Sequence, residues 1–281
     1  MHSPAASLAA PPDVSVVLPC YRSAALAHRS VDRLTDFLDG APLTYEIVVV
    51  DDGGRDFAPG AFEGRDHVRL LELPVNRGKG AAVRAGMQAA RGDVRVFTDV
   101  DLPYDLDLIE VMAACIREQG YHLVIGDRTL PGSTYATVTS FRRSLASALF
   151  SDFVGRIVTG GYFDTQCGLK AVRGDVAALI FPLLRVDRFA FDVELVYLAL
   201  KHRLDIKRIP VQLRNNETST VRLFRDSTRG VVDVLRIKYH QVAGHYQCDA
   251  LDRITEAEFV TLRARAARDA EGRVRQHSVS A

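Results

Sequence analysis

The sequence predicts an α/β fold with a mostly parallel, doubly wound sheet flanked by helices. Short apolar runs of strand length alternate with amphipathic helical patterns through the first half of the chain. The clearest strand, at 46–53, contains a continuous β-branched run, which is typical of a strand covered on both faces. The chain has 281 residues, of which 47% are hydrophobic, and this is enough to bury a sizeable core.

The individual elements follow from this alternation. Apolar runs predict strands at 14–19, 46–53, 68–73, 94–98, 122–126 and 206–213. Helical spacing of apolar residues predicts helices at 24–38, 80–90, 105–118, 140–158, 192–202, 227–240 and 255–268. A polar loop at 163–170 should enter a further strand. We expect a flexible lead at 1–12, one domain at 13–245, and a charged helical extension with a tail at 246–281.

Composition excludes several protein classes. The 36 Lys and Arg residues nearly balance 35 Asp and Glu residues, so no global field attracts nucleic acid. There is no apolar run of membrane-spanning length, and the N-terminus lacks the pattern of a signal peptide. The four cysteines are widely spaced without a CxxC motif, which favours reduced thiols in a cytoplasmic protein. They are Cys20, Cys115, Cys167 and Cys248.

Acidic residues follow two of the predicted strands. Ligands of doubly wound sheets bind beyond the carboxyl ends of the strands. Asp99 and Asp101 are two residues apart on an extended backbone, so their carboxylates face the same side and suit Mg²⁺ or Mn²⁺. The alternative is a solvated pair that caps the next helix. Asp51 and Asp52 can accept hydrogen bonds from a base or ribose, or they can simply form a turn.

A glycine-rich segment at 76–80 opens the helix predicted at 80–90. Its backbone N–H groups, the helix start and the charge of Lys79 favour an anion such as a diphosphate. The alternative is an ordinary glycine-rich entry into a helix. The segment lacks the P-loop pattern GxxxxGK[ST].

Five sequence blocks in this order resemble the family 2 inverting glycosyltransferases. The similarity extends from about residue 14 to residue 213 and is greatest to the dolichyl- and polyprenyl-phosphate sugar synthases, in the β-glucosyltransferase branch. It implies the GT-A fold, a Rossmann-like mostly parallel sheet flanked by helices, here with a C-terminal helical extension. The blocks are VSVVLPCYR, EIVVVDDGGRD, NRGKGAAVRAGMQAARGD, VFTDVDLP and FDTQCGLKAVRGD.

The resemblance also implies roles for single residues. Asp101 should be the more direct metal ligand. Pro103 stands where the mannose branch has a metal-binding Gln, so a water or another residue must take that place. Gln166 is a candidate for it, although a structural role in its loop is the better explanation. The residues assigned to the donor nucleotide and its metal are Pro19, Tyr21, Asp51, Asp52, Lys79, Asp99 and Asp101.

The acceptor decides whether a catalytic base is needed. A phosphomonoester is largely ionised at neutral pH, since its second pKa is about 6, and it needs cations rather than a base. Arg128, Arg142 and Arg143 fall where the similar synthases place phosphate-binding arginines. An alcohol needs a carboxylate base, and Asp192 and Glu194 stand where the wider family has its acidic motif. The alternative for these two acids is a pair stabilised by a helix N-terminus.

Residues 201–241 are strongly basic. They contain ten Lys and Arg residues against four Asp and Glu residues, a net charge of +6. With the amphipathic pattern at 227–240, this predicts peripheral contact with the inner face of an anionic membrane. The alternative is a solvated helix packed on the domain. Arg222 and Arg225 can alternatively close over the diphosphate as a lid.

The resemblance implies transfer of a hexose from a nucleotide sugar to a polyprenyl or dolichyl phosphate. Glucose is the favoured hexose, and UDP is favoured over GDP. One alternative is a soluble glycosyltransferase that acts on a small hydroxyl acceptor in specialised metabolism. The other is a non-catalytic nucleotide-sugar-binding protein, against which the intact Asp99, Asp101 and Lys79 argue.

Overall fold

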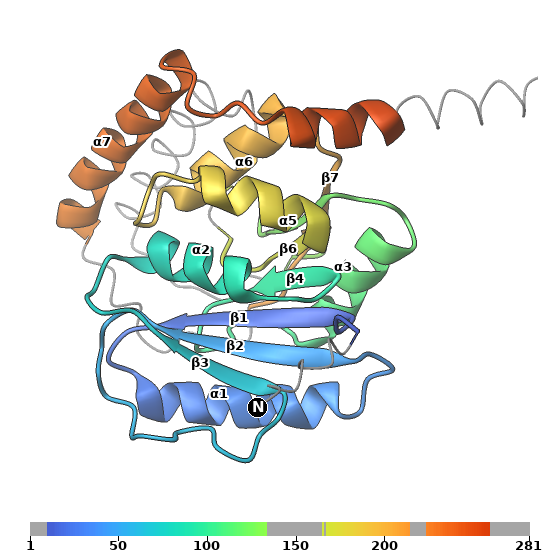
Figure 1. Ribbon diagram of the computed structural model, residues 1–281, viewed down its shortest axis with the longest axis vertical. Coiled ribbons are helices and arrows are strands. Elements are labelled where there is room, and N and C mark those ends of the chain that lie inside the picture. Colours follow the sequence, from blue (N-terminus) through green and yellow to red (C-terminus); the bar gives the residue numbers. More distant parts are fainter. Residues whose placement is uncertain (1–9, 134–164, 166, 214–222, 259–281) are drawn as a thin grey trace, which may run out of the picture.

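A seven-stranded sheet forms the centre of the molecule (Figure 1). The computed structural model describes residues 10–133, 165, 167–213 and 223–258. The strands are β1 (Val14–Cys20), β2 (Tyr45–Asp51), β3 (Val68–Glu72), β4 (Val94–Phe97), β5 (Leu123–Asp127), β6 (Lys170–Arg173) and β7 (Ile206–Pro210). Their order is β3-β2-β1-β4-β6-β5-β7. Strand β6 runs antiparallel to β4 and β5, and the other neighbours are parallel, which confirms the mostly parallel sheet.

Helices cover both faces of the sheet. The core on one face contains α1 (Ala24–Leu38) and α3 (Asp107–Arg117). The core on the other contains α2 (Lys79–Ala89), α5 (Gly174–Ile180), α6 (Phe191–Lys201) and α7 (Leu223–Val242), with the short 3-10 helix η2 (Phe181–Leu183). In β2 alternate side chains enter opposite cores: Ile47 and Val49 face α1, whereas Val48 and Val50 face α2. The two-sided burial expected from the β-branched run is therefore confirmed.

Some elements differ from the sequence prediction. Helix α5 and the 3-10 helix η2 were not expected, and α7 begins at Leu223, before the predicted start at residue 227. The predicted helix at 140–158 lies outside the described residues. Of the region around the predicted helix at 255–268, residues 249–258 are described and helical.

The C-terminal part of the described chain packs onto the same core as the sheet. Tyr246 and Leu251 are fully buried. The ring of buried His202 lies between the Asp252 carboxylate at 2.7 Å and the Tyr246 carbonyl oxygen at 3.0 Å. The expected extension at 246–281 thus begins with residues that belong to the core.

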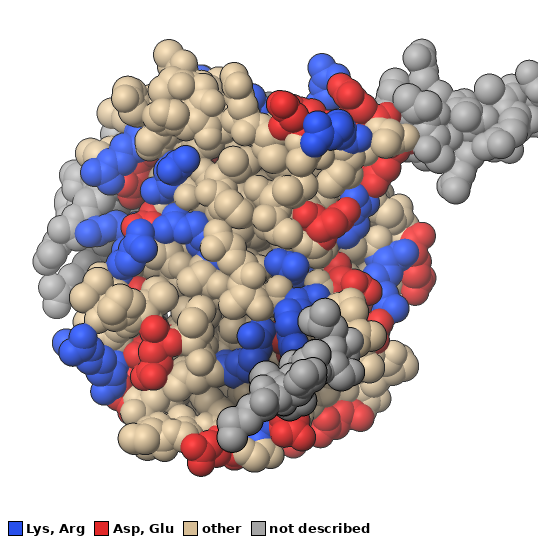
Figure 2. Space-filling view, viewed as in Figure 1, with Lys and Arg blue, Asp and Glu red and all other residues tan. Residues whose placement is uncertain are grey.

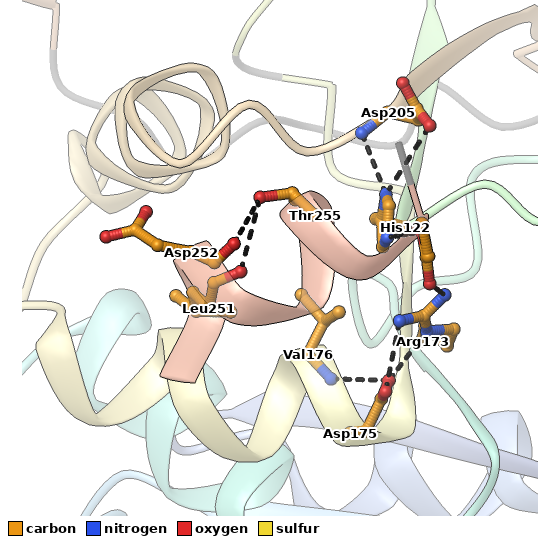
Figure 3. A network of polar contacts seen from close by, with 9 residues as sticks. His122, Arg173, Asp175, Val176, Asp205, Leu251, Asp252 and Thr255 are labelled. Carbon is orange, nitrogen blue, oxygen red and sulfur yellow. Dashed lines mark hydrogen bonds and ion pairs between the residues drawn. The ribbon is translucent and has the colours of Figure 1, made fainter. Parts of the chain in front are cut away.

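A second buried histidine joins the helix at 249–258 to the sheet (Figure 3). His122 Nδ1 accepts a hydrogen bond from the Asp205 backbone N–H at 2.9 Å, and its Nε2 lies 2.7 Å from Glu258 Oε2. Arg173 donates to both Glu258 and Asp175. Burial is the largest effect on His122 and lowers its pKa, although the Glu258 charge opposes this shift. This network fixes the end of the described chain beside β5 and β6.

Among the described residues, no helix is long and apolar enough to cross a membrane.

Candidate active site

The carboxyl ends of β1, β2 and β4 meet at one edge of the sheet. In register, Cys20 of β1 pairs with Asp51 of β2, and Val17 of β1 pairs with Phe97 of β4. Pro19 is buried in β1, whereas the Tyr21 ring, just beyond this strand, is exposed. The edge therefore brings together the predicted residues of β1, β2 and β4, as expected for a doubly wound sheet.

Asp51 and Asp52 are buried and bonded to backbone amides. The Asp51 carboxylate accepts from the N–H groups of Gly54 at 2.9 Å and Arg55 at 2.8 Å. The Asp52 carboxylate accepts from the N–H groups of Arg77 at 2.8 Å and Gly78 at 2.7 Å. Burial raises the pKa of Asp52, although both amides oppose this shift. In these contacts the pair shapes the two loops beside the site, and a role with base or ribose stays a prediction.

Lys79 begins α2 and extends into the site. Its side chain is 15% exposed, and its ammonium contacts Asp99 Oδ1. Helix α2 lies very close to β1, because a Cβ on Gly86 would come within 2.4 Å of Val17 Cγ1. The amides expected to cradle an anion are partly engaged by the protein itself: Gly78 N–H donates to Asp52, and Ala81 N–H donates to the Asp187 carbonyl. The Lys79 side chain is thus the clearest anion-binding group at this helix start.

Asp99 and Asp101 lie in the turn after β4. The Asp99 side chain is 37% exposed, and Asp101 lies at the surface. Leu102 follows with φ 47°, a left-handed conformation that a leucine rarely adopts. Partial burial of its carboxyl group and the charge of Asp99 raise the pKa of Asp101. The turn therefore holds two carboxylates whose mutual repulsion a cation would relieve.

Gly168 leaves room for the Asp99 carboxylate. A Cβ on Gly168 would come within 2.1 Å of Asp99 Oδ2, so a larger residue there would displace this carboxylate. The chain passes this point at the carboxyl edge immediately before it enters β6 (Lys170–Arg173). For this reason β6 runs back through the sheet, antiparallel to β4.

Asp192 lies beneath the site in a buried ion pair. Its Oδ1 contacts the Lys170 ammonium, which also donates to the Cys167 carbonyl oxygen at 2.6 Å. The two side chains are 4% and 0% exposed. Burial raises the pKa of Asp192, and the charges of Lys170 and Lys79 oppose this shift only in part. Asp192 is therefore close to the catalytic edge, but it is already paired with a lysine.

Glu194 has the contacts of a structural carboxylate. It is fully buried in the first turn of α6 and accepts from the backbone N–H groups of Arg185 and Val186, each at 2.9 Å. It also accepts from the Tyr246 hydroxyl. Burial raises the pKa of Glu194, and these donors oppose the shift. In these contacts Glu194 is held by three donors of the protein itself, and a catalytic role for it stays a prediction.

The predicted phosphate-binding arginines are only partly described. Arg128 follows β5 and is half-buried. Burial raises the pKa of Tyr104, and the charge of Arg128 opposes this shift, so the two residues lie close together. Arg142, Arg143, Gln166 and Arg222 lie outside the described residues, as does the side chain of Arg225.

Sequence reasoning missed three residues that shape the site: Gly168, Lys170 and Asp187. The carboxylate of Asp187 contacts Arg84 at 2.5 Å and Arg77 at 3.0 Å, which ties its loop to α2. Lys170 had a recognisable signal, because it is a lone ionisable residue in an otherwise apolar stretch and must find a charge partner when buried. Gly168 and Asp187 had no such signal, since their contacts come from residues distant in sequence.

The arrangement suits the departure of a charged leaving group. Two carboxylates at a partly exposed edge provide hard oxygen ligands for a divalent ion, and Lys79 provides a neighbouring positive charge. An ion at this place would stabilise negative charge that develops on a diphosphate.

Comparison with known proteins agrees with this site. The model of the Glycosyl transferase family 2 matches residues 15–173. The dolichyl-phosphate beta-glucosyltransferase of Dictyostelium discoideum is 30% identical over 246 residues, which cover 82% of this chain and 75% of that protein. The enzyme of the same name from Drosophila melanogaster is 35% identical over 219 residues, which cover 71% of this chain and 66% of that protein.

Solved structures share the fold at lower identity. Mannosyl-3-phosphoglycerate synthase from Rubrobacter xylanophilus has a TM-score of 0.57 at 18% identity, and the match covers 84% of this chain and 76% of that one. Glucosyl-3-phosphoglycerate synthase from Mycobacterium tuberculosis, in complex with Mn²⁺, UDP-glucose and phosphoglyceric acid, has a TM-score of 0.56 at 19% identity, with coverages of 80% and 78%. The GT-A architecture, the acidic turn after β4 and the sequence match together place this chain in the family 2 glycosyltransferases.

Proposed function

We propose that this chain transfers glucose, with inversion, from UDP-glucose to a polyprenyl phosphate of the dolichyl type. The observation that carries the proposal is the pair Asp99 and Asp101 beside Lys79 at the carboxyl edge of the sheet. The similar enzymes from Dictyostelium discoideum and Drosophila melanogaster, whose names specify glucose and dolichyl phosphate, support the choice of sugar and acceptor.

The residues present fit a divalent cation. Asp99 and Asp101 offer carboxylate oxygens, and the ammonium of Lys79 already occupies a cation position on Asp99. Mn²⁺ or Mg²⁺, when bound, would supply charge stabilisation for the departing diphosphate. Mn²⁺ and UDP-glucose in the similarly folded glucosyl-3-phosphoglycerate synthase support this choice of metal and nucleotide.

The chain's own residues have distinct tasks in this proposal. Asp99 and Asp101 hold the metal, and Lys79 neutralises the diphosphate. Asp51 and Asp52 keep the loops at 53–55 and 76–78 in place through their backbone amides. Because an ionised phosphate acceptor attacks without losing a proton, no general base is required. The lysine-paired state of Asp192 agrees with a reaction that needs no base.

A comparison of acceptors tests this proposal. With polyprenyl phosphate, Asp192→Asn and Glu194→Gln should each retain substantial turnover, whereas Arg142→Ala or Arg143→Ala should impair use of the acceptor. With an alcohol acceptor, loss of a general base should instead slow transfer by about 10²–10⁴-fold. UDP binding by each variant serves as the folding control. A carboxylate variant that binds donor normally but is inactive with polyprenyl phosphate would contradict the proposal.

The preference for UDP has its own test. Melting temperatures measured with UDP-glucose or GDP-mannose, each with Mn²⁺, should rise more with the uridine nucleotide, because a ligand that binds only the folded state stabilises it. An equal or larger rise with GDP-mannose would exclude this donor assignment.

We also propose that α7 places the enzyme on the cytoplasmic face of an anionic membrane, where a lipid-linked acceptor is found. Four apolar side chains at helical spacing are exposed along this helix: Val232, Leu235, Tyr239 and Val242. Figure 2 shows Lys and Arg side chains on the same side of the molecule as α7, and Arg236 and Lys238 of this helix are exposed and half-buried. An apolar stripe flanked by cations is typical of a helix that lies in a membrane interface.

Vesicle sedimentation tests this membrane contact. Leu235→Glu should weaken binding to phosphatidylcholine vesicles that contain phosphatidylglycerol, because it adds a negative charge to the apolar stripe. Val111→Glu is the matched control, since Val111 is similarly exposed on α3. Equal binding by the two variants would exclude α7 as the contact surface.

A further inference from the structure

Lys79 has a fixed backbone and a side chain that meets the metal site. Its neighbours Gly78 and Gly80 lie against the loop at 186–188, where added Cβ atoms would come within 2.6 Å of Asp187 O and 2.7 Å of Val186 O. The Ala81 N–H also donates to Asp187 O at 3.0 Å. The start of α2 cannot shift without breaking these contacts, so only the side chain of Lys79 has freedom to move.

One oxygen of the Asp99 carboxylate is already held by a cation of the protein. Oδ1 contacts the Lys79 ammonium, whereas Oδ2 lies beside Gly168. A divalent ion that binds Asp99 through Oδ1 comes close to the Lys79 ammonium. Like charges at such a distance repel strongly, so each weakens the binding of the other to this oxygen.

A second carboxylate lies near Lys79. Asp192 lies close enough for its charge and that of Lys79 to influence each other. Lys170 neutralises Asp192 from the other side.

We infer that Lys79 competes with the divalent ion for Asp99, and that the metal releases the Lys79 ammonium toward the donor diphosphate. This inference rests on the proposed function and adds a coupling between two of its ligands. Since coupling between two binding sites is reciprocal, the nucleotide must raise metal affinity by the same factor by which the metal raises nucleotide affinity. Lys79 is then a positioning residue for the metal as well as a ligand of the donor.

Mn²⁺ binding to the nucleotide-free protein tests the competition. Paramagnetic resonance of free Mn²⁺ gives the dissociation constant directly, without any activity assay. Lys79→Gln should bind Mn²⁺ about three- to tenfold more tightly than the native protein, the scale of a partly buried ion pair. Arg77→Gln is the matched control. It removes one positive charge two residues before Lys79, and the Arg77 side chain pairs with Asp187. Its Mn²⁺ affinity should change much less.

The same titration with UDP tests the coupling. UDP should raise the Mn²⁺ affinity of the native protein by a larger factor than that of Lys79→Gln, in which no ammonium remains to be released. Lys79→Arg keeps the charge and should bind Mn²⁺ no more tightly than the native protein. This variant provides an independent test if the glutamine variant folds poorly.

Three results would overturn the competition: weaker or unchanged Mn²⁺ binding in Lys79→Gln, an equal gain in Arg77→Gln, or tighter binding in Lys79→Arg. Asp99→Asn separates this failure from failure of the proposed function. If Asp99→Asn weakens Mn²⁺ binding but Lys79→Gln does not strengthen it, only the competition is wrong. If Asp99→Asn binds Mn²⁺ as the native protein does, both the competition and the proposed metal site are wrong.

Discussion

The acidic pair after β2 and the acidic pair after β4 lie at the same edge of the sheet but have different contacts. Asp51 and Asp52 are buried, and each accepts two backbone N–H groups. Asp99 and Asp101 are more exposed, and Asp99 is held by a lysine side chain. Among the hydrogen bonds between described residues, none involves the Asp101 side chain, which is exposed. The first pair has the contacts of a structural unit, whereas the second leaves oxygen atoms available to a ligand.

The difference shows that position at a strand end does not by itself decide the role of a carboxylate. After β2 the chain turns through Gly53 and Gly54, which lets backbone amides approach the acids; Gly53 has φ 72°. After β4 the turn passes through Leu102 and presents the acids outward. The supply of nearby N–H donors therefore separates structural acids from candidate metal ligands.

Asp101→Asn provides the largest test of this difference. Transfer should fall by about 10²–10³-fold, the usual cost of losing one group that stabilises developing charge. The melting temperature should stay close to the native value, because Asp101 lies at the surface. Transfer rates with UDP-glucose and calorimetry measure the two quantities. Full activity in this variant, or in the native enzyme with excess EDTA, would show that the acids after β4 hold no essential metal.

Asp52→Asn should instead mainly lower the stability of the protein. An amide accepts more weakly from Arg77 N–H and Gly78 N–H than a carboxylate does, and one of the two bonds is lost. The free energy of unfolding should fall by about 1.5–3 kcal/mol, as for hydrogen bonds to a charged group. Urea denaturation measures this change. If stability is unchanged but UDP binding is lost, Asp52 is a nucleotide ligand and the contrast between the two pairs is weaker than proposed.

Glu46 extends the comparison to the opposite end of β2. Its buried carboxylate accepts from Ser15 Oγ at 2.7 Å, Arg91 N–H at 2.6 Å and Arg69 Nη2 at 2.9 Å. Burial raises the pKa of Glu46, but these donors outweigh burial and leave it below the ordinary value of 4.5. A carboxyl group with a lowered folded-state pKa stabilises the protein above its unfolded pKa and loses this contribution as pH falls.

Glu46→Gln should therefore lower the free energy of unfolding by about 1–2 kcal/mol at neutral pH. The difference from the native protein should shrink as pH falls below 4.5 and through the lower folded-state pKa. Urea titrations of both proteins across this range measure the trend. A difference that is constant with pH would mean that shape, rather than charge, makes Glu46 stabilising.

The local patterns of the sequence predicted the half of the fold that contains the two acidic pairs. The expected strand at 46–53 overlaps β2, which ends two residues earlier at Asp51, and the expected helix at 24–38 coincides with α1. Both depend on apolar periodicity, which neighbouring residues determine. The strand direction of β6 was not predictable, because it depends on where the chain returns to the sheet beside Asp99.

The residues of the candidate site also divide into those that local sequence patterns predicted and those that they did not. Asp99, Asp101 and Lys79 were identified because they follow or open a recognisable element. The ion pair between Lys170 and Asp192 joins residues 22 positions apart that no local pattern connects. Only the folded arrangement shows that Asp192 is occupied by a lysine.

The buried ring of Tyr246 bears on how the protein is made. Its hydroxyl binds Glu194, 52 residues earlier, and its ring lies 5.7 Å from that of Tyr197. A growing chain that has released all seven strands still lacks this ring and Leu251, so part of the apolar surface of α6 stays uncovered. Domains generally fold as units, and exposed apolar surface favours aggregation. Chaperone demand during synthesis should therefore persist until residues 246–258 have emerged, well after the last strand.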